Sequence, residues 1–388
     1  MPCTGTTRRC YKRRLRFALM AAGSALVGLV GVLVAAEIAP AKYPGPNGEI
    51  AFGRLDRAVD GYRVFAADSE GKHERRLVHG DAESPIWSPD GSKILVSLSR
   101  AGMAVPATLN RDGSRLELLE SSAEMDMVCS AWSPDSARLL CHGHSQEHPE
   151  LNGLYTVRAT DGGGLTRLTD NPFDEADIAG DYSPSGAQIA FTRQRPGRSR
   201  PRGALFVANA DGTGLRQITP FGMPDHDEVP KWSPDGTRIL FGSVTEKLLV
   251  VRPDGTRLRK ISPRTRGRRG IIRLKRKLLK QCRRESAKNK RCKEKARKRA
   301  KRQTTGIGFD PGWSPDGERI VFSLRRRPRG RVDIYTTRPD GTHLVQITDT
   351  RGFETFADWG SASREGPRTM RSARSRPPTV FRRDPNHP

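Results

Sequence analysis

Large apolar side chains are scarce in this sequence. Aromatic residues make up 6% of the 388 residues, and apolar residues of all kinds make up 35%. This composition argues against one large continuous core. Glycine and proline are plentiful, with 39 and 28 copies, and they favour many short strands joined by turns.

Several motifs of catalytic chemistry are missing. The sequence has no Gly-x-Ser-x-Gly elbow for a serine nucleophile and no glycine-rich phosphate loop ending in Lys-Ser or Lys-Thr. The string from His144 to His148 has the His-x-x-Glu-His spacing of a zinc peptidase, which requires both histidines on one helix face. Gly143 and Pro149 flank the string, so we interpret it as an exposed polar loop. The sequence therefore gives no catalytic residue, metal ligand or cofactor.

Acidic residues are also few, with 43 against 69 basic residues and a net charge of +26. The excess positive charge lies in three segments, residues 1–16, 264–302 and 361–388. The second of these carries a net charge of +19, and the rest of the chain is close to neutral. The basicity is therefore expected on appendages and not on the folded body.

The N-terminal segment has the pattern of an export signal. Six basic residues precede an uncharged run from Phe17 to Ala36, and the small-x-small sequence Ala39-Pro40-Ala41 follows. About 20 apolar residues are enough to cross a bilayer, so residues 1–41 are predicted to be a signal peptide or a retained membrane anchor. Either alternative places the rest of the chain outside the cytoplasm, as a periplasmic, cell-wall or secreted protein. No cysteine follows the run where a lipoprotein signal requires one.

An internal repeat is the strongest pattern in the chain. Trp-Ser-Pro-Asp-Gly begins at Trp87, Trp232 and Trp313, degenerate copies begin at Trp132 and Tyr182, and a short apolar strand follows each copy. Proline and glycine supply the φ angles of a tight turn, and aspartate caps it. Four strands per repeat of roughly 45–50 residues are typical of β-propeller blades. All five tryptophans fall in this register, so we expect them to be structural.

The two ends of the repeat region complement each other. Asn47–Phe52 matches the strand that follows the Trp-Ser-Pro-Asp-Gly segment, which we call the Trp turn. Ala357–Gly360 has the tryptophan of such a segment without a following strand. We therefore predict an all-β, six-bladed β-propeller over residues 44–360, closed by pairing of the N- and C-terminal strands. Its closing blade takes the innermost strand from the C-terminal end and three strands from the N-terminal end. Residues 361–388, rich in Arg, Ser and Pro, are predicted to be a disordered tail.

These repeats resemble those of the TolB family of β-propellers, from about Asn47 to Gly360 apart from the basic segment. The resemblance implies a periplasmic or secreted protein that binds protein partners at the mouth of its central channel and has no catalytic chemistry. The separate N-terminal domain of TolB itself is not expected between Ala41 and Asn47, so the resemblance does not extend to a Tol–Pal role. Prolyl-oligopeptidase-type peptidases have similar repeats, but no hydrolase domain is expected here.

An acidic cluster, Asp225-His226-Asp227-Glu228, precedes the strand that leads to Trp232. In the TolB family, the loops that precede the tryptophan of each repeat lie near the channel mouth. Carboxylates and histidine can hold a cation or a basic partner, and a solvated acidic turn is the alternative. We take Asp225, His226, Asp227 and Glu228 as ligand-binding candidates.

Residues 264–303 form a basic insertion between the fifth and sixth predicted blades, with a helical pattern of apolar residues. On one continuous helix Cys282 and Cys292 would lie about 15 Å apart, whereas a disulfide needs Cα atoms within about 7 Å. We therefore predict a helical hairpin that turns near Ser286–Asn289 and is joined by a Cys282–Cys292 disulfide.

The basic insertion has the charge to bind polyanions, and its candidate residues are Arg283, Arg284, Lys288, Lys290 and Arg291. No aromatic residue lies between positions 264 and 303 to stack on bases, which disfavours nucleic acid. An anionic envelope polymer or a membrane surface is favoured instead, and a solvated segment without a partner is the alternative.

Cys129 and Cys141 flank Trp132 on a predicted hairpin and could form a second disulfide or stay as buried thiols.

Together these patterns predict an exported, monomeric, non-catalytic binding or scaffold propeller that recognises a protein or envelope polymer at the channel mouth. The alternatives are a propeller polysaccharide lyase or hydrolase and a polyanion binder that uses the insertion. A convergent set of His, Asp, Glu and Arg at one end of the channel would favour the enzyme.

Overall fold

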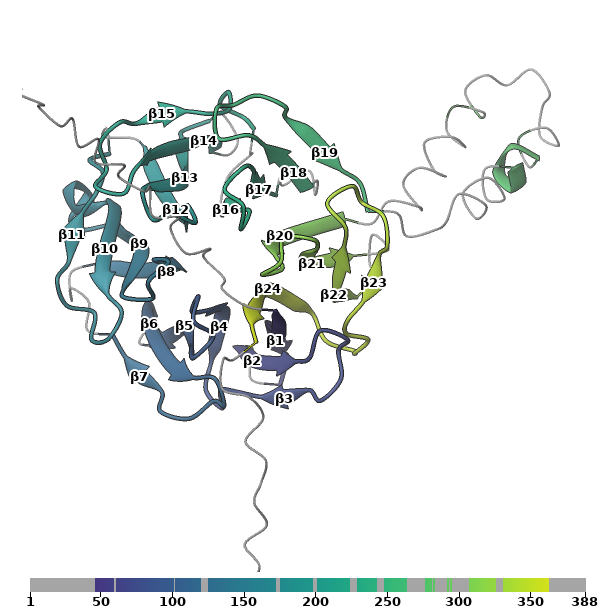
Figure 1. Cartoon of the computed structure of the whole chain (residues 1–388), viewed down its shortest axis with the longest axis horizontal. Helices are drawn as coiled ribbons and strands as arrows, with labels where there is room; N and C mark the ends of the chain where they lie inside the picture. Colours follow the sequence, from purple (N-terminus) through teal and green to yellow (C-terminus); the bar gives the residue numbers. More distant parts are fainter. Residues whose placement is uncertain are drawn as a thin grey trace, which may run out of the picture. The chain divides into compact units, whose positions relative to one another are not determined.

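The computed structural model of the chain is a β-propeller of six blades arranged around a central axis (Figure 1). The predicted fold is therefore confirmed. The structure describes residues 46–58, 61–100, 102–119, 125–171, 175–197, 201–223, 229–242, 248–263, 276–280, 282, 292, 294, 307–325 and 331–362.

Each blade is an antiparallel sheet of four strands that follow one another from the axis outwards. The first blade contains β24 (Glu354–Ser361), β1 (Asn47–Asp56), β2 (Gly61–Ala67) and β3 (Arg75–Arg76). The second contains β4 (Ala82–Trp87), β5 (Lys93–Arg100), β6 (Met103–Asn110) and β7 (Glu117–Leu118). The third contains β8 (Asp126–Trp132), β9 (Arg138–His144), β10 (Gly153–Arg158) and β11 (Thr166–Arg167), with the 3-10 helix η1 (Pro149–Leu151) between β9 and β10.

The remaining blades follow the same order. The fourth contains β12 (Ala176–Tyr182), β13 (Gln188–Arg195), β14 (Arg202–Asn209) and β15 (Arg216–Gln217). The fifth contains β16 (Lys231–Trp232), β17 (Ile239–Phe241), β18 (Leu248–Val251) and β19 (Arg259–Ile261). The sixth contains β20 (Ile307–Trp313), β21 (Ile320–Arg325), β22 (Val332–Thr337) and β23 (Val345–Gln346).

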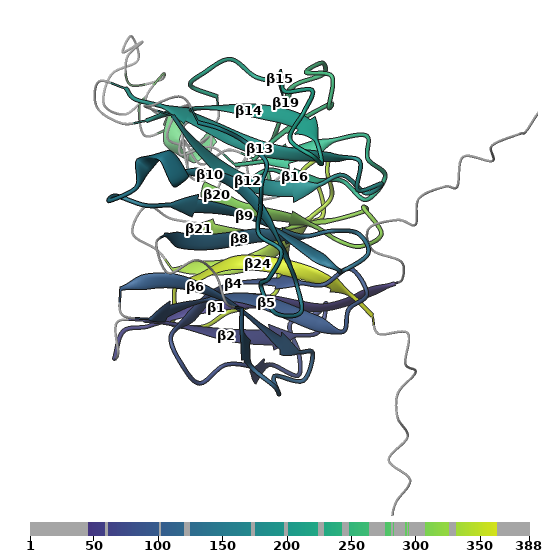
Figure 2. The ribbon, with the colours of Figure 1, turned by 90° about the vertical axis from the view of Figure 1, so that its left-hand side faces the viewer.

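The ring is closed in the first blade by strands from the two ends of the repeat region, as predicted. β24 lies beside β1 (Figure 2) and pairs with it antiparallel, so that Trp359 lies opposite Ile50 and Glu354 lies opposite Arg54. The strand continues to Ser361, and the amide of Ala362 donates a hydrogen bond of 2.8 Å to the Pro46 carbonyl. Pairing on this side leaves β1 without an open inner edge.

The Ser-Pro-Asp-Gly turns have the chemistry that the repeat predicts. In the turn after Trp87, the Ser88 hydroxyl donates to Asp90 at 2.6 Å, and the Gly91 amide donates to the Ser88 carbonyl at 2.9 Å. Gly91 has a φ of +69°, a conformation that glycine adopts without steric cost. The degenerate copy places Ser136 at the equivalent position, with a φ of +60°.

The hydrophobic core is divided into six clusters, and each cluster lies between two neighbouring blades. The five tryptophans are all buried within them. The indole of Trp132 donates to the Ile86 carbonyl of the preceding blade at 3.1 Å, and that of Trp313 donates to the Lys231 carbonyl at 3.2 Å. Many small cores explain how a chain with few aromatic residues folds at this size.

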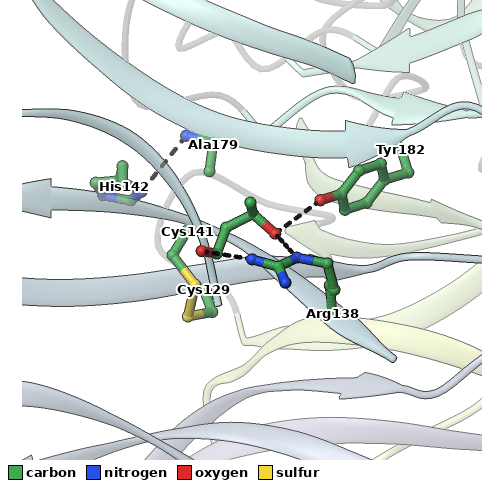
Figure 3. Close-up of a disulfide and its surroundings, with 7 residues drawn as sticks. Cys129, Arg138, Cys141, His142, Ala179 and Tyr182 are labelled. Atoms are coloured by element: carbon green, nitrogen blue, oxygen red, sulfur yellow. Dashed lines mark hydrogen bonds between the residues drawn. A yellow bond between two sulfur atoms is a disulfide. The ribbon is translucent and has the colours of Figure 1, made fainter. Parts of the chain in front are cut away.

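A disulfide joins the two innermost strands of the third blade (Figure 3). Cys129 of β8 and Cys141 of β9 are paired across the ladder, with Cα atoms 3.8 Å apart, so the disulfide and not the pair of free thiols is formed. Nearby, the Tyr182 hydroxyl of the fourth blade donates to the Thr156 hydroxyl, which also accepts from Arg138. These bonds connect the third and fourth blades.

A second disulfide joins Cys282 and Cys292, with Cα atoms 5.8 Å apart. Both cysteines are helical, as are residues 276–280 and 294. The predicted hairpin turn at 286–289 lies outside the described residues, as do residues 1–41 and 363–388. No helix in the part of the chain that the structure describes is long and apolar enough to cross a membrane.

Candidate functional site at the channel mouth

The two faces of the propeller differ in their loops. The inner strand of each blade runs towards its tryptophan, or towards Tyr182 in the fourth blade, so the Ser-Pro-Asp-Gly turns that follow all lie on one face. The opposite face, which we call the mouth face, contains the beginnings of the inner strands and the loops between the second and third strands of each blade. The residues that precede each Trp turn therefore approach the channel from the mouth face.

Three consecutive blades have an unusual inner strand near this face. Asp310, Phe356 and Ser84, in the sixth, first and second blades, have φ values of +50°, +55° and +53°. Each lies three residues before the Trp turn, where the pairing with the next strand shifts register. Such bulges bend a strand and change the direction of its side chains, and they occur often beside binding sites.

Two carboxyl groups of this region have raised pKa values. Burial raises the pKa of Glu83, and the negative charge of Asp81 adds to the effect. Asp310 is half-buried, yet protein atoms surround its carboxyl closely, and this burial raises its pKa to about 6. The Phe356 amide opposes this shift by donating a hydrogen bond at 3.5 Å, and the charge of Glu83 adds to it. Among the described residues, no basic side chain forms an ion pair with Glu83 or Asp310.

Two partly exposed aromatic residues, Tyr62 and Phe356, lie beside these carboxyl groups. Tyr62 packs edge to face against Phe356, with ring centroids 5.8 Å apart. Burial raises the pKa of Tyr62, and the nearby charges of Glu83 and Asp310 raise it further. Phe309, the residue before Asp310, stacks on Phe353 with centroids 6.5 Å apart, and the Arg325 guanidinium already lies 5.7 Å from the Phe353 centroid. Rings and carboxylates together provide apolar contact area and attraction for a cationic group.

Acidic residues at the beginnings of the inner strands of the fourth and first blades are neutralised. In the fourth blade Asp177 accepts two hydrogen bonds from Arg193, at 2.7 and 2.8 Å, and Glu175 pairs with Arg195. In the first blade the fully buried Glu354 accepts a hydrogen bond from Arg54 at 2.8 Å. We define the mouth cluster as Glu83 and Asp310, for which no basic partner is found among the described residues, together with the two aromatic residues beside them, Tyr62 and Phe356.

The ligand-binding candidates predicted from the sequence, Asp225 to Glu228, lie outside the described residues. β16 begins at Lys231, so this segment leads into the inner strand of the fifth blade. The Lys231 side chain crosses from this strand to the third blade and donates to the Ser130 carbonyl at 2.7 Å. The polyanion candidates Arg283, Arg284, Lys288, Lys290 and Arg291 also lie outside the described residues.

Sequence reasoning missed the mouth cluster. Glu83 and Asp310 come four and three residues before the tryptophans of their blades, so a comparison of the segments before the five tryptophans and Tyr182 would have found them. Tyr62 carries no such signal, because it lies on β2 and not in the segment that precedes a tryptophan.

The zinc-like string lies in a loop of the third blade. His144 is the exposed last residue of β9, and His148 precedes η1, with its Nδ1 atom 3.2 Å from Glu150. The two histidines therefore do not share a helix face. Across the residues for which the structure gives positions, no group of three or more His, Cys, Asp or Glu side chains could hold a metal ion.

Comparison with known proteins adds a family and a set of similar folds. The family described as TolB beta propeller domain matches residues 50–267. No curated protein shows significant similarity to the sequence. TolB from Acinetobacter baumannii has 15% identity and a TM-score of 0.57, over 81% of this chain and 67% of that one. A putative TolB from Agrobacterium tumefaciens has 17% identity and a TM-score of 0.51, over 82% of this chain and 100% of that one.

A protein that is not named as a TolB also has a similar fold. Kuenenia stuttgartiensis hydrazine synthase has 16% identity and a TM-score of 0.54, over 81% of this chain and 47% of that one. At such identities the structural similarities show the fold alone. Chemistry must therefore be argued from the residues of this chain.

Proposed function

This chain belongs to the TolB beta propeller domain family, and on that basis we propose that it is an exported, non-catalytic binding propeller. It holds a protein partner at the mouth of its channel. TolB-like propellers bind proteins. We propose the kind of partner for this chain from the residues at its channel mouth.

The mouth cluster is the observation that supports this proposal. Glu83 and Asp310 supply negative charge without basic partners among the described residues, and the partly exposed Tyr62 and Phe356 lie beside them. Aromatic residues are enriched at protein interfaces and often dominate the binding energy. The acidic charge favours a partner segment that contains lysine or arginine, and it disfavours an anionic polymer at this place.

An extracytoplasmic location is part of the same proposal. The pattern of residues 1–41 supports export, through either a cleaved signal or a retained anchor. Two disulfides within one chain support an oxidising compartment. The basic insertion 264–303 would then be available to an anionic envelope polymer or membrane surface, separately from the mouth.

The test is a pull-down from the envelope fraction of the producing organism, with the wild-type protein and two charge-matched variants. The mouth variant combines Glu83→Gln and Asp310→Asn, and we expect its partner affinity to fall about tenfold or more because charge-assisted contacts are lost. The control combines Asp161→Asn and Asp211→Asn, exposed turn residues on the opposite face. Equal capture by both variants would refute binding at the mouth.

A third variant separates the insertion from the mouth. Deletion of residues 264–302 should leave capture of the partner unchanged at low and high salt if the mouth holds it. Loss of all capture with the deletion or with added salt would instead identify an electrostatic binder that uses the insertion.

The raised pKa of Asp310 favours one alternative, a propeller polysaccharide lyase or hydrolase. A carboxyl group that titrates near neutral pH beside a second acid and a tyrosine has the groups for proton transfer. This alternative predicts that the wild-type protein turns over a polysaccharide. It also predicts that Glu83→Gln and Asp310→Asn each abolish this turnover. Binding without turnover supports the non-catalytic function.

A further inference from the structure

A cavity of about 380 Å³ lies on the mouth face, at the end of the β1–β2 hairpin of the first blade. Five arginines line it: Arg54, Arg57, Arg63, Arg76 and Arg351. Four of them come from β1, β2, β3 and the loop after β1, and Arg351 comes from the segment before β24. Of the described residues in the lining, only Asp56 is acidic.

One of the five arginines is already neutralised by carboxylates outside the cavity. Arg54 donates to Glu354 at 2.8 Å and to Glu74 at 2.7 Å, and neither carboxylate lines the cavity. The other four arginines have only Asp56 as a counter-charge among the described lining residues. The cavity therefore has an excess of about three positive charges.

Two arginines are held in place by main-chain oxygens. Arg76 donates to the carbonyls of Val78 and His79, at 2.9 and 2.8 Å. Arg63 donates to the carbonyls of Tyr62 and Gly80, at 3.0 and 3.1 Å. Neutral carbonyls fix the direction of a guanidinium and leave its charge uncompensated.

Three of the arginines still have donors or charge to offer a ligand. The Nε atom of Arg63 is buried and has no hydrogen-bond acceptor, and the nearest carboxylate, that of Asp56, is 4.0 Å away. A buried donor without an acceptor costs free energy, which a bound anion would recover. Arg57 and Arg351 are exposed and form no ion pair within the described part of the chain.

Three properties of the ligand follow from this lining. Guanidinium groups bind the oxygens of phosphate and carboxylate in a two-pronged geometry. A carboxylate carries one charge, whereas a phosphate monoester carries about 1.5 to 2 at neutral pH and matches the excess better. The volume falls within the range of about 300–1,000 Å³ of small-molecule sites. The Arg54 guanidinium lies 4.3 Å from the Phe65 ring centroid, so Leu55 and Ala58 in the lining offer the apolar contact for a carbon skeleton.

We infer that this cavity is a binding site for a phosphate monoester of a small polyol or sugar. The site is separate from the mouth cluster. Tyr62 and Arg63 are neighbours on β2, and successive side chains of a strand point to opposite faces. Tyr62 contacts Phe356 of the mouth cluster, whereas Arg63 lines the cavity.

Isothermal titration calorimetry of the full-length protein tests the inference. The probes are glycerol phosphate, inorganic phosphate, sulfate and a glycerol phosphodiester at matched ionic strength. The site variant combines Arg57→Ala and Arg351→Ala, both exposed, so the fold does not depend on them. The control combines Arg115→Ala and Arg158→Ala, exposed residues on the opposite face, and keeps the same net charge and the same basic insertion.

We expect glycerol phosphate to bind the wild type and the control equally and the site variant about a hundredfold more weakly, since each arginine contributes about tenfold. Sulfate should be a weaker probe that competes for the same site. Equal affinities of the two variants would overturn the assignment of the site. A phosphodiester that binds as tightly as the monoester would overturn the assignment of the ligand.

Discussion

The contact that closes the ring can be tested with a single methyl group. Gly360 of β24 lies against Trp87 of the second blade, and a Cβ atom at Gly360 would be 2.4 Å from the indole Cγ atom and 2.5 Å from Cδ2. Real Cβ atoms do not approach other atoms so closely, so either the ring or the strand must move. Trp87 is only 1% exposed and is packed within the core between the first two blades, so it has little room to move.

The expected cost follows from this overpacking. Extra methyl groups in a well-packed core destabilise a protein by about 1–3 kcal/mol. Replacement of glycine by alanine also reduces the entropy of the unfolded chain, which stabilises by about 0.4–1 kcal/mol where the site has room. We therefore expect Gly360→Ala to lower the free energy of unfolding by about 1–3 kcal/mol.

The matched control is Gly80→Ala, because a Cβ atom at Gly80 has nothing within 4 Å. We expect this variant to be neutral or slightly stabilised. Urea unfolding followed by circular dichroism measures both variants against the wild type. Equal unfolding midpoints for Gly360→Ala and Gly80→Ala would refute the packing of β24 against Trp87, and with it the closure of the ring by this strand.

Three further predictions concern the pH, the disulfide and a buried ion pair. The folded state raises the pKa of Asp310 to about 6, so the folded chain binds more protons than the unfolded chain between about pH 4 and 6. Stability should therefore fall as the pH rises through this window, and urea titrations should show that Asp310→Asn lacks this contribution. Replacement of Cys129 and Cys141 by serine should lower the free energy of unfolding by about 3 kcal/mol, because the bond closes a loop of 12 residues; an unchanged urea midpoint would contradict this. Arg193→Ala should cost about 3–5 kcal/mol in the same assay by leaving the Asp177 carboxylate buried without its partner, and Arg193→Ala with Asp177→Ala should cost less.

The repeat made the architecture predictable from the sequence. Each copy from Trp87 onwards contains its own turn chemistry and its own apolar strand, so local reasoning is enough to place a blade. The split blade was predictable because Asn47–Phe52 and Ala357–Gly360 each lack what the other supplies. Cys129 and Cys141 were placed on one hairpin, but the choice between bond and free thiols depends on the register of that hairpin, which includes a bulge between Cys129 and Ala131.

The mouth cluster and the arginine-lined cavity could not be predicted in this way. Tyr62, Glu83 and Asp310 come together only because the ring places the first, second and sixth blades side by side. Their positive-φ bulges arise at ordinary residues and not at glycine, so the sequence carries no turn signal there. Arg57 and Arg351 line one cavity because β24 pairs with β1, a contact between distant parts of the chain.

The shared first blade has a consequence for the order in which the protein acquires its binding surfaces. Arg54 and Glu354, which form an ion pair across β1 and β24, are 300 positions apart in the chain. During synthesis β1 therefore emerges long before the strand that completes its sheet, while the intermediate blades can fold as they appear. Phe356 and Arg351 arrive with that last strand, so neither the mouth cluster nor the cavity is complete on a partly made chain. Under the proposed function, a ligand at either place would therefore bind only to the finished chain.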